Sequence, residues 1–512
     1  MDTVLIKALQ LLCCLSLLVV LHEGGHFGFA KLFKTRVTRF YMFANYGFHL
    51  FSTYDDWFRR LLGKPLVTKR GQEGQNFFAW LRNKYYLLTG QKDKVQTENI
   101  GNKEYDDSVG TEYGIGWLPI GGYVAIDGMI DETNQKLSAE PKPWEFRSKK
   151  IWQRFLIMFG GVLMNLITAW VIYSVVLFVW GRDYVPMTSI KDGFEYNEQA
   201  RSIGFQNGDI PIRADGKDIV EYNGGAVMRI ISKASSVTVL RGNEEVELTM
   251  PEDGLSMLKM IQSQPMFLAP LAEALIDSVV PGSAADKAGI EKGMRLVSVN
   301  GKDIKTWGDF DCEVTLRRED VLGSPDCTAT DSLKWRTLDA VVASADMSRM
   351  DTLSLQLDEN YLMGVTRHMP DFQTEHLSYS LASCIPAGLS YGWRVLKNYV
   401  SDLRYVASAD GAKSVGSFIT IGNIFPSAWD WQQFWMLTAL ISIILAVMNI
   451  LPIPGLDGGH IMLLLYEGIT GHQPSEKAML WIERIGLGIL LALMLLAISN
   501  DFRNFILPLF GL

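Results

Sequence analysis

The feature that most constrains this chain is a short polar motif at the end of a long apolar run. Val4–Leu21 is about as long as a bilayer core is thick, and His22-Glu23-Gly24-Gly25-His26 follows it directly. On a helix, His22 and His26 lie one turn apart on the same face, which is the spacing at which two imidazoles bind one zinc ion. Glu23 projects beside them, where it can take a proton from an attacking water. The motif therefore predicts a zinc site at membrane depth.

Chance is the alternative explanation of this motif. The chain contains 7 histidines among 512 residues, so two of them at helical spacing around a glutamate are a rare coincidence. Ionisable residues within or beside a membrane helix are also costly, and they usually have a function. We therefore favour the metal site.

Composition narrows the class of protein only loosely. A hydrophobic content of 48% suits a mixture of membrane helices and soluble parts, and 512 residues allow several domains. The net charge of -8 gives no sign of nucleic-acid binding, so we expect no nucleic acid among the partners. Five cysteines are too few for a disulfide scaffold. Cys312 and Cys327 could form a disulfide if their compartment is oxidising.

Four segments are apolar and long enough to be candidate membrane helices. They are Val4–Leu21, Phe155–Trp180, Phe434–Leu451 and about Trp481–Ile498. The loop between the first two has strongly basic ends, formed by Lys31, Lys34, Arg36 and Arg39 and by Arg147, Lys149, Lys150 and Arg154. The positive-inside rule places this loop in the cytoplasm, so the large region 182–433 should lie on the other face of the membrane.

The first loop contains an insertion and a predicted hairpin. Residues 51–112 are polar and charged, and we interpret them as a solvated insertion. Residues 113–126 carry short apolar and aromatic runs around Gly121 and Gly122, which predict a membrane-associated β-hairpin. A strand edge close to the metal would make Gly121 and Gly122 substrate-binding residues. The alternative is a surface hairpin that only fills space.

The region beyond the second membrane segment contains an internal repeat. Residues 200–219 align without gaps on residues 285–304, with glycines at equivalent positions and the same Gly-Lys-Asp-Ile ending. Repeated glycines at fixed offsets predict the same turns built twice, and hence two domains, assigned to 182–266 and 267–370. The pattern resembles the core of PDZ domains, whose grooves bind an extended chain as an added strand. The alternative is a pair of bulky spacers.

Residues 371–430 connect this region to the third membrane segment. Within them, Leu377–Ala407 is rich in Tyr, Leu, Trp and Gly. This composition predicts a helix that either lies on the outer membrane surface or packs as an ordinary domain helix.

Two histidines and a water do not complete a protein zinc site, so a third protein ligand is expected. The strongest candidate is Asp457, because a carboxylate directly after the proline-broken third segment is costly to keep without a function. The predicted topology brings it to the depth of the two histidines. Asn449 could bind an extended substrate or a developing oxyanion, or could make a helix–helix hydrogen bond. His460 is a weaker candidate ligand, since one turn past Asp457 it can instead face the cytoplasm.

Together these residues resemble the site-2 protease family of intramembrane zinc metalloproteases, and most closely its bacterial type with tandem PDZ domains. The resemblance rests on His22–His26 and on Asn449–Gly458, which has every fixed position of the family's N-x-x-P-x-P-x-L-D-G motif. It covers most of the chain except residues 51–112. It also extends to residues 113–126, similar to the family's membrane-associated hairpin, and to Gly160-Gly161…Asn165 on the second core helix.

The resemblance implies a multi-pass α-helical protein of the inner membrane, with about four transmembrane helices and two PDZ-like α+β domains in the periplasm. It implies zinc ligands at His22, His26 and Asp457, and Glu23 as the catalytic base near the cytoplasmic side. The expected reaction is cleavage within the transmembrane segments of membrane proteins, such as anti-sigma factors or remnant signal peptides, after a first cut by another protease. The PDZ-like domains would bind or sterically exclude substrate ectodomains.

Two other classes of function are compatible with these residues. An inactive membrane scaffold or chaperone would use the PDZ-like domains for binding, but a pure binder has no need of Glu23. A metal transporter would use His22, His26 and Asp457 as a translocation site. Transporters usually show internal membrane repeats, and the four apolar segments show none.

Overall fold

The computed structural model divides the chain into two compact units, residues 1–181 with 378–512 and residues 182–377. The residues that it describes are 2–62, 81, 84–85, 110–118, 121–129, 140–251, 255, 260–261, 263, 265–322, 336–345, 347–358, 362–406 and 416–503.

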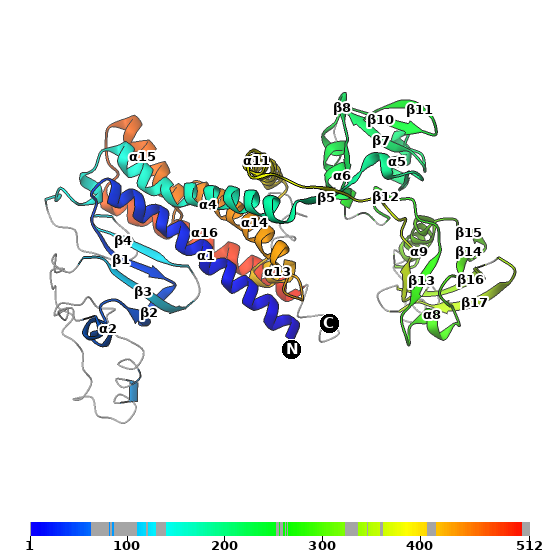
Figure 1. Ribbon diagram of the computed structural model, residues 1–512, viewed down its shortest axis with the longest axis horizontal. Helices are drawn as coiled ribbons and strands as arrows, with labels where there is room; N and C mark the ends of the chain where they lie inside the picture. The colour runs from blue at the N-terminus through cyan, green and yellow to red at the C-terminus, as the bar shows by residue number, and fades with distance from the viewer. Residues whose placement is uncertain are drawn as a thin grey trace. The chain divides into compact units, whose positions relative to one another are not determined.

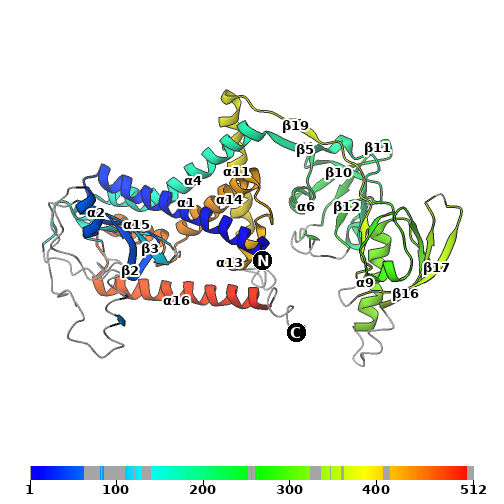
Figure 2. The same cartoon turned by 60° about the horizontal axis from the view of Figure 1, so that its bottom comes forward.

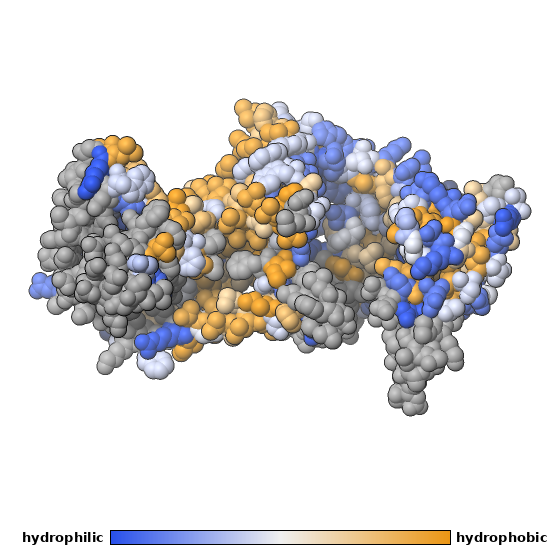
Figure 3. Space-filling view, turned by 90° about the horizontal axis from the view of Figure 1, so that it is seen from below, coloured by the Kyte–Doolittle hydropathy of each residue, from blue (hydrophilic) through white to orange (hydrophobic). Residues whose placement is uncertain are grey.

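Among the described residues, the first unit contains four helices that are long and apolar enough to cross a membrane. They are α1 (Asp2–Leu32), α4 (Ile151–Trp180), α14 (Trp431–Ile450) and α16 (Glu476–Asp501). All four predicted membrane segments are therefore helical. The first helix does not end where its apolar run ends, because α1 continues through the His22–His26 motif to Leu32. Exposed apolar side chains cover much of the surface of this unit (orange in Figure 3), as expected for helices that face lipid.

Helix α4 is the element on which four other helices of this unit pack. It contacts α1, α14, α11 (Leu381–Val406) and α15 (Asp457–Thr470) (Figures 1 and 2). Glycines bring α1 and α4 almost into backbone contact, since a Cβ built on Gly25 would lie 2.2 Å from the Gly160 carbonyl oxygen. Small residues at helix contacts are typical of membrane bundles, where close backbone approach replaces the hydrophobic effect.

The helix expected within residues 371–430 is present as α11. Its inner face packs against α4 and α14 through Tyr391, Val395 and Leu396, while Ile385 and Trp393 are exposed. One face is thus buried in the helical unit, and the other presents large apolar side chains to the surroundings. The position of α11 on the membrane surface stays a prediction. The short helix α13 (Phe418–Ile424) precedes α14.

A four-stranded sheet lies beside these helices, in the order β2-β3-β1-β4. Its strands are β1 (Val37–Met42), β2 (Ala44–Ser52), β3 (Glu112–Leu118) and β4 (Tyr123–Ile126). The predicted hairpin over 113–126 is wrong in its pairing. Strands β3 and β4 do form there, but β1 lies between them, parallel to β3 and antiparallel to β4. Both edges of β1 are thereby satisfied, which a two-stranded hairpin could not achieve.

The insertion 51–112 begins and ends on this sheet. Glu112 accepts hydrogen bonds from the Tyr41 hydroxyl at 2.7 Å and the Ser52 hydroxyl at 2.6 Å, all in buried positions. The described part of the insertion includes α2 (Asp56–Leu61). Most of the insertion lies outside the described residues, as does the C-terminal segment 504–512. A short 3-10 helix, Phe146–Ser148, leads into α4.

The second unit contains two hydrophobic cores and two similar four-stranded sheets, β11-β10-β7-β8 and β15-β14-β16-β17. The elements around the first core are β5 (Arg182–Pro186), the 3-10 helix Met187–Ser189, β6 (Phe194–Tyr196), α5 (Glu198–Ile203), β7 (Ile210–Ala214), β8 (Lys217–Asp218), β9 (Glu221–Tyr222), α6 (Gly224–Lys233), β10 (Ser236–Arg241), β11 (Glu244–Thr249) and β12 (Leu268–Pro270). Those around the second are β13 (Ile276–Val279), α8 (Ala284–Lys287), β14 (Arg295–Val299), β15 (Lys302–Asp303), α9 (Trp307–Leu322), β16 (Thr337–Ala343), β17 (Met350–Gln356) and β18 (Val365–Arg367). Strand β19 (Glu375–Leu377) returns to pair with β5.

The sequence repeat corresponds to repeated backbone turns. Gly204 and Gly289 end equivalent helical turns with φ of +116° and +80°, and Gly208 and Gly293 both have positive φ before equivalent strands β7 and β14. The boundary placed after Met266 is wrong by a short segment. Phe267 and Leu268 belong to the first core, and β12 pairs with β6. Strand β12 therefore packs with the first core, so this segment belongs to the first of the two predicted domains.

One half-buried carboxyl group joins the elements around the two cores of this unit. Glu195, on β6, accepts a hydrogen bond of 3.2 Å from the Gly308 backbone amide at the start of α9, and the Thr306 hydroxyl also bonds to it. Burial raises the pKa of Glu195 to about 7, against these two hydrogen bonds, which lower it. Cys312 lies nearby on α9, half-buried and free. Cys327 lies outside the described residues, so the pairing of these two cysteines stays open.

Candidate metal centre and active site

Three side chains from distant parts of the sequence converge in the helical unit. The Nε2 atom of His22 lies 3.2 Å from Oδ2 of Asp457, the Nε2 atom of His26 lies 3.3 Å from the same oxygen, and the two nitrogens are 3.3 Å apart. All three side chains are largely buried, with exposed fractions of 13%, 7% and 14%. They form the cluster that the sequence predicted.

The spacing of these three atoms matches the demands of zinc. Ligand atoms about 2.0–2.1 Å from a tetrahedral zinc ion lie about 3.3 Å from one another. The Asp457 Oδ2 atom is buried, and two imidazole nitrogens are close to it. The three ligand atoms thus lie around a common centre. Two imidazoles and a carboxylate are a typical donor set for zinc, so the residues present fit the ion.

The chain after α14 is shaped to bring Asp457 to this centre. Helix α14 ends at Ile450, before Pro452 and Pro454, because proline cannot continue a helix. Gly455 follows with φ +89°, and a Cβ on Gly458 would lie only 2.0 Å from the Leu451 carbonyl oxygen. The tight reversal therefore depends on glycine, and it places Asp457 as the first residue of α15.

Helix α4 provides the surface against which both histidines rest. A Cβ on Gly161 would lie 2.5 Å from both His22 Cε1 and His26 Nε2, so only glycine leaves room for the imidazoles. The Nδ1 atom of His26 lies 2.8 Å from the Ile157 carbonyl oxygen. Donating Nδ1–H to this carbonyl keeps the Nε2 lone pair free for a metal.

His22 has a different partner on α4. Its Nδ1 atom lies 3.1 Å from the side-chain nitrogen of Asn165, which is fully buried. The sequence pointed to Asn165 only through a family resemblance and assigned it no role. A polar residue within an apolar helix was the available signal, because such residues need a partner.

Glu23 lies between the candidate metal ligands and the sheet. The backbone of Val124, on β4, hydrogen-bonds its carboxylate. A Cβ on Gly122 would lie 3.4 Å from Glu23 Cγ and 2.7 Å from the Tyr41 carbonyl oxygen, so glycine permits β4 to approach α1 closely. The predicted catalytic base therefore has a strand beside it. Gly121 has φ +70° and begins the turn into this strand.

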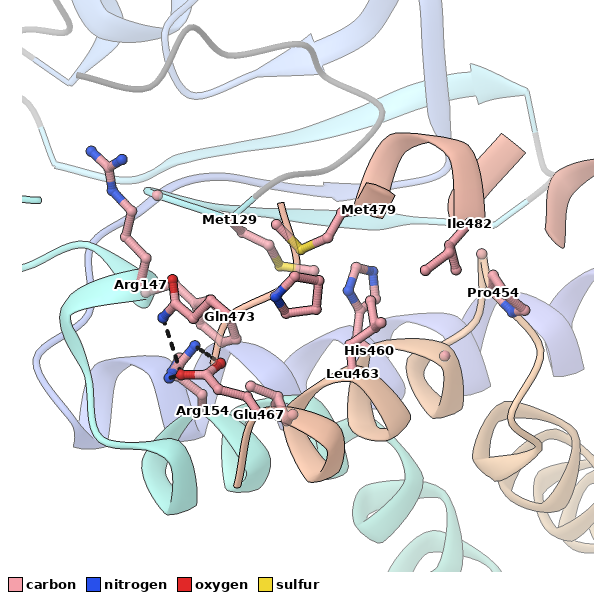
Figure 4. Close-up of a pocket in the computed structure, with 16 residues that line it drawn as sticks. Met129, Arg147, Arg154, Pro454, His460, Leu463, Glu467, Gln473, Met479 and Ile482 are labelled. Carbon is pink, nitrogen blue, oxygen red and sulfur yellow. Dashed lines mark hydrogen bonds and ion pairs between the residues drawn. The ribbon is translucent and has the colours of Figure 1, made fainter. Parts of the chain in front are cut away.

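Asn449 is not part of this cluster. It is half-buried in the last turn of α14, and its amide makes no hydrogen bond with the described residues. His460 is not a member of the metal-binding group either. Figure 4 shows His460 reaching from α15 into a neighbouring cavity, with Met479 and Ile482 from the start of α16 and Met129 from the segment after β4.

This cavity has a volume of about 180 Å³ and is bordered by residues on both sides of Asp457 in the sequence, including Gly455 and Gly459. At one end, Arg154 of α4 makes two hydrogen bonds with Glu467 of α15, at 2.9 and 2.5 Å. Gln473 donates a further hydrogen bond of 3.1 Å to Glu467 (Figure 4). The pair ties α15 to α4, so the helix that carries Asp457 is held at both its ends.

Comparison with known proteins agrees with this geometry. The model of peptidase family M50 matches residues 94–493. The chain belongs to peptidase family M50. The match includes Asn165 and Asp457, and the His22–His26 motif lies before it in the sequence.

Individual proteins of similar sequence are also named as proteases. The chain is 28% identical over 425 residues to Protease RseP of Yersinia pestis, covering 78% of this chain and 88% of that protein. It is 26% identical to Regulator of sigma-E protease RseP of Escherichia coli, over 78% and 88% of the two chains, and 25% identical to a Putative zinc metalloprotease of Xylella fastidiosa, over 77% and 87%. As an M50 peptidase the protein is a zinc metalloprotease of the site-2 type. Its apolar helices make it a multi-pass membrane protein.

Proposed function

We propose that this peptidase cleaves the transmembrane segments of membrane proteins, with His22, His26 and Asp457 as zinc ligands and Glu23 as the catalytic base. The observation that carries the proposal is the mutual spacing of 3.2 to 3.3 Å among the three ligand atoms. Two of these atoms belong to α1, a helix apolar enough to cross a membrane, and the third belongs to α15, which packs against the candidate membrane helix α4. A protease site at that depth has access to the transmembrane segments of other proteins.

The chain's own residues divide the chemical work. Bound at the centre, zinc would supply Lewis acidity to the attacking water and to the scissile carbonyl. Glu23 takes a proton from that water as its oxygen bonds to the scissile carbon, and passes the proton to the leaving amine when the C–N bond then breaks. Asn449, whose amide makes no hydrogen bond with the described residues, is available to bind the substrate or its oxyanion.

Strand β4 is the candidate docking site for the substrate backbone. A helical substrate hides its carbonyl groups in its own hydrogen bonds and must unwind before attack. Strand β4 is the outer strand of its sheet and lies beside Glu23, so its free edge can offer replacement hydrogen bonds to an extended chain. Gly121 and Gly122 would then let the substrate come close at the start of this strand.

The domains of residues 182–377 fit a role as PDZ-like modules outside the cytoplasm. Their repeated sheets and turns support this assignment, and the basic ends of the loop between α1 and α4 support a cytoplasmic position for that loop. In this proposal the domains bind or sterically exclude substrate ectodomains at the periplasmic face of the inner membrane. Substrates such as anti-sigma factors or remnant signal peptides would therefore be cut after another protease has shortened them.

A cleavage assay in membranes tests the proposal. A single-span model substrate, with its outer domain intact or truncated, is co-expressed with wild type or with Glu23→Gln. Cleavage of the truncated form alone, and by wild type alone, is the expected result. Cleavage of both forms by wild type would keep the protease and remove the size filter. Absence of cleavage across several substrate helices, with zinc shown to be bound, would overturn the proposed intramembrane activity.

A further inference from the structure

The two candidate histidine ligands are held in different ways. His26 has a backbone carbonyl, that of Ile157, as the partner of its Nδ1 atom. A backbone carbonyl can only accept, so it permits a single tautomer of His26, with the proton on Nδ1 and the lone pair on Nε2. His22 has the side-chain amide of Asn165 as the partner of its Nδ1 atom, at 3.1 Å. An amide can either donate or accept, so it permits both tautomers of His22.

The surroundings of Asn165 restrict what its side chain can do. The residue is fully buried, and its backbone carbonyl accepts a hydrogen bond of 2.7 Å from the Ser442 hydroxyl of α14, itself fully buried. The amide nitrogen faces His22, while the amide oxygen is buried and makes no hydrogen bond with the described residues. An unpaired oxygen at such a depth is costly. A half-turn of the amide would give this oxygen a partner and leave the amide nitrogen in its place, so the proton position on His22 decides between the two arrangements.

A half-turn of the amide provides that second arrangement. With the amide nitrogen toward His22, the Nδ1 atom accepts, and the proton of the neutral imidazole is on Nε2, facing Asp457 at 3.2 Å. With the amide oxygen toward His22, Nδ1–H donates to it, and the Nε2 lone pair is free. The first arrangement places a proton between His22 and Asp457, as a histidine–aspartate pair without a metal requires. The second leaves the Nε2 lone pair of His22 available to bind a metal.

We propose that Asn165 is the positioning residue of His22: its amide oxygen accepts Nδ1–H and so holds the imidazole in the orientation and tautomer that bind the metal. This inference rests on the metal centre proposed above. Asn165 does not touch the substrate or the metal. It acts through His22, in the way that Ile157 acts through His26.

The nature of the side chain at position 165 decides the outcome of substitution. An aspartate of similar size can accept Nδ1–H but cannot donate when ionised, so it allows only the metal-binding tautomer. An alanine removes the acceptor and leaves His22 free to rotate. Partners that orient a metal-binding histidine typically change metal affinity by about 10–100-fold when they are lost.

The test measures zinc affinity directly, by competition with a chromogenic chelator, on the full-length protein purified in detergent. Asn165→Ala should raise the zinc dissociation constant by about 10–100-fold, and Asn165→Asp should keep it within a few-fold of wild type. The absorption spectrum after Co²⁺ substitution gives a second readout, in which Asn165→Asp should resemble wild type and Asn165→Ala should not. Thr168→Val, a change at another buried polar residue of α4, controls for general loss of packing.

Each outcome decides a different point. Equal zinc affinity of Asn165→Ala and wild type would overturn the inference while leaving the metal centre intact. Equal losses in Asn165→Ala and Asn165→Asp, with both proteins folded, would also overturn it, because the acceptor would not matter. If Asn165→Ala fails to fold, the zinc affinity and the Co²⁺ spectrum of Asn165→Asp by themselves decide whether the inference holds. Failure of wild type to bind zinc, or unchanged binding by His22→Ala, would instead remove the proposed centre itself.

Discussion

The Nε2 atom of His22 lies 3.2 Å from the Oδ2 atom of Asp457, although the two residues come from opposite ends of the chain. They meet because α1 and α15 both pack against α4. Gly25 and Gly161 allow α1 to approach α4, and the Arg154–Glu467 pair holds α15 against it. The second membrane helix thus brings the candidate metal ligands together while contributing no residue to that group.

Loss of the carboxylate should weaken metal binding before it affects the fold. Asp457→Asn replaces a charged ligand by a neutral one of the same shape, so the zinc dissociation constant should rise by at least about 10-fold and proteolysis should fall with it. The measurement is zinc content after dialysis against a chelator, alongside cleavage of a model substrate. A fully active Asp457→Ala protein would remove Asp457 from the ligand set.

Loss of the proposed base should stop proteolysis without weakening zinc binding, in contrast to loss of the Asp457 carboxylate. Glu23→Gln keeps the size of the side chain but cannot take a proton, so turnover should fall by about 10²–10⁴-fold while zinc stays bound. Zinc content and cleavage rate, measured on the same preparation, separate this result from that of Asp457→Asn. Metal loss in Glu23→Gln would show that Glu23 serves the metal site and not the proton transfer.

The glycine behind the imidazoles should be indispensable. Gly161→Ala would place a methyl group 2.5 Å from both His22 and His26, so the imidazoles must move by a large part of an ångström. Displacement on that scale should reduce activity by about 100-fold. Gly28→Ala is the matched control, because its Cβ would meet nothing within 4 Å. Full activity in Gly161→Ala would argue against this geometry of the ligands.

Substrate preference should follow the ease of unwinding. Replacing a glycine near the cut by leucine strengthens the substrate helix by about 1 kcal/mol, so cleavage should slow by about fivefold for each such change. Cleavage rates of a series of model substrates, matched for expression and insertion, provide the measurement. Indifference to these replacements would mean that unwinding onto strand β4 does not limit the reaction.

The contact between the two domains of residues 182–377 should depend on pH. The pKa of Glu195 is raised by burial from 4.5 to about 7, so the packed carboxyl group binds its proton more tightly than the unfolded one does. Its contribution to stability is therefore fully present below pH 4.5 and is lost as the pH rises through 7. After allowance for partial exposure, the free energy of unfolding should fall by about 2 kcal/mol over this range.

The measurement is thermal unfolding of wild type and Glu195→Gln between about pH 4.5 and 8, a range that spans the two pKa values. Glutamine keeps the hydrogen-bonding shape without titrating, so the difference between the two proteins should grow with pH in favour of the variant. Asp309 and Asp311 also face this carboxyl group and should shift the midpoint upward. A constant difference at every pH would show that Glu195 does not titrate in this range.

The pairing of the strands near the site could not be predicted from neighbouring residues. The runs at β3 and β4 read as a hairpin because they are adjacent in sequence and separated by glycines. Strand β1 lies between them because its two edges require partners. This strand directly follows α1, in a stretch where the basic residues predicted a cytoplasmic loop and gave no sign of a strand. Strand partners depend on which edges remain free after the whole sheet has formed.

The sequence by itself predicted the candidate ligands, the candidate base and the membrane segments, since helical spacing, long apolar runs and a proline-broken carboxylate motif are local properties. Only the tertiary structure decided that β4 is the strand beside Glu23, that Asn165 is the partner of His22, and that Glu195 links two domains. These three relationships join residues far apart in the chain. They depend on how closely helices and strands approach, which glycines permit and packing completes.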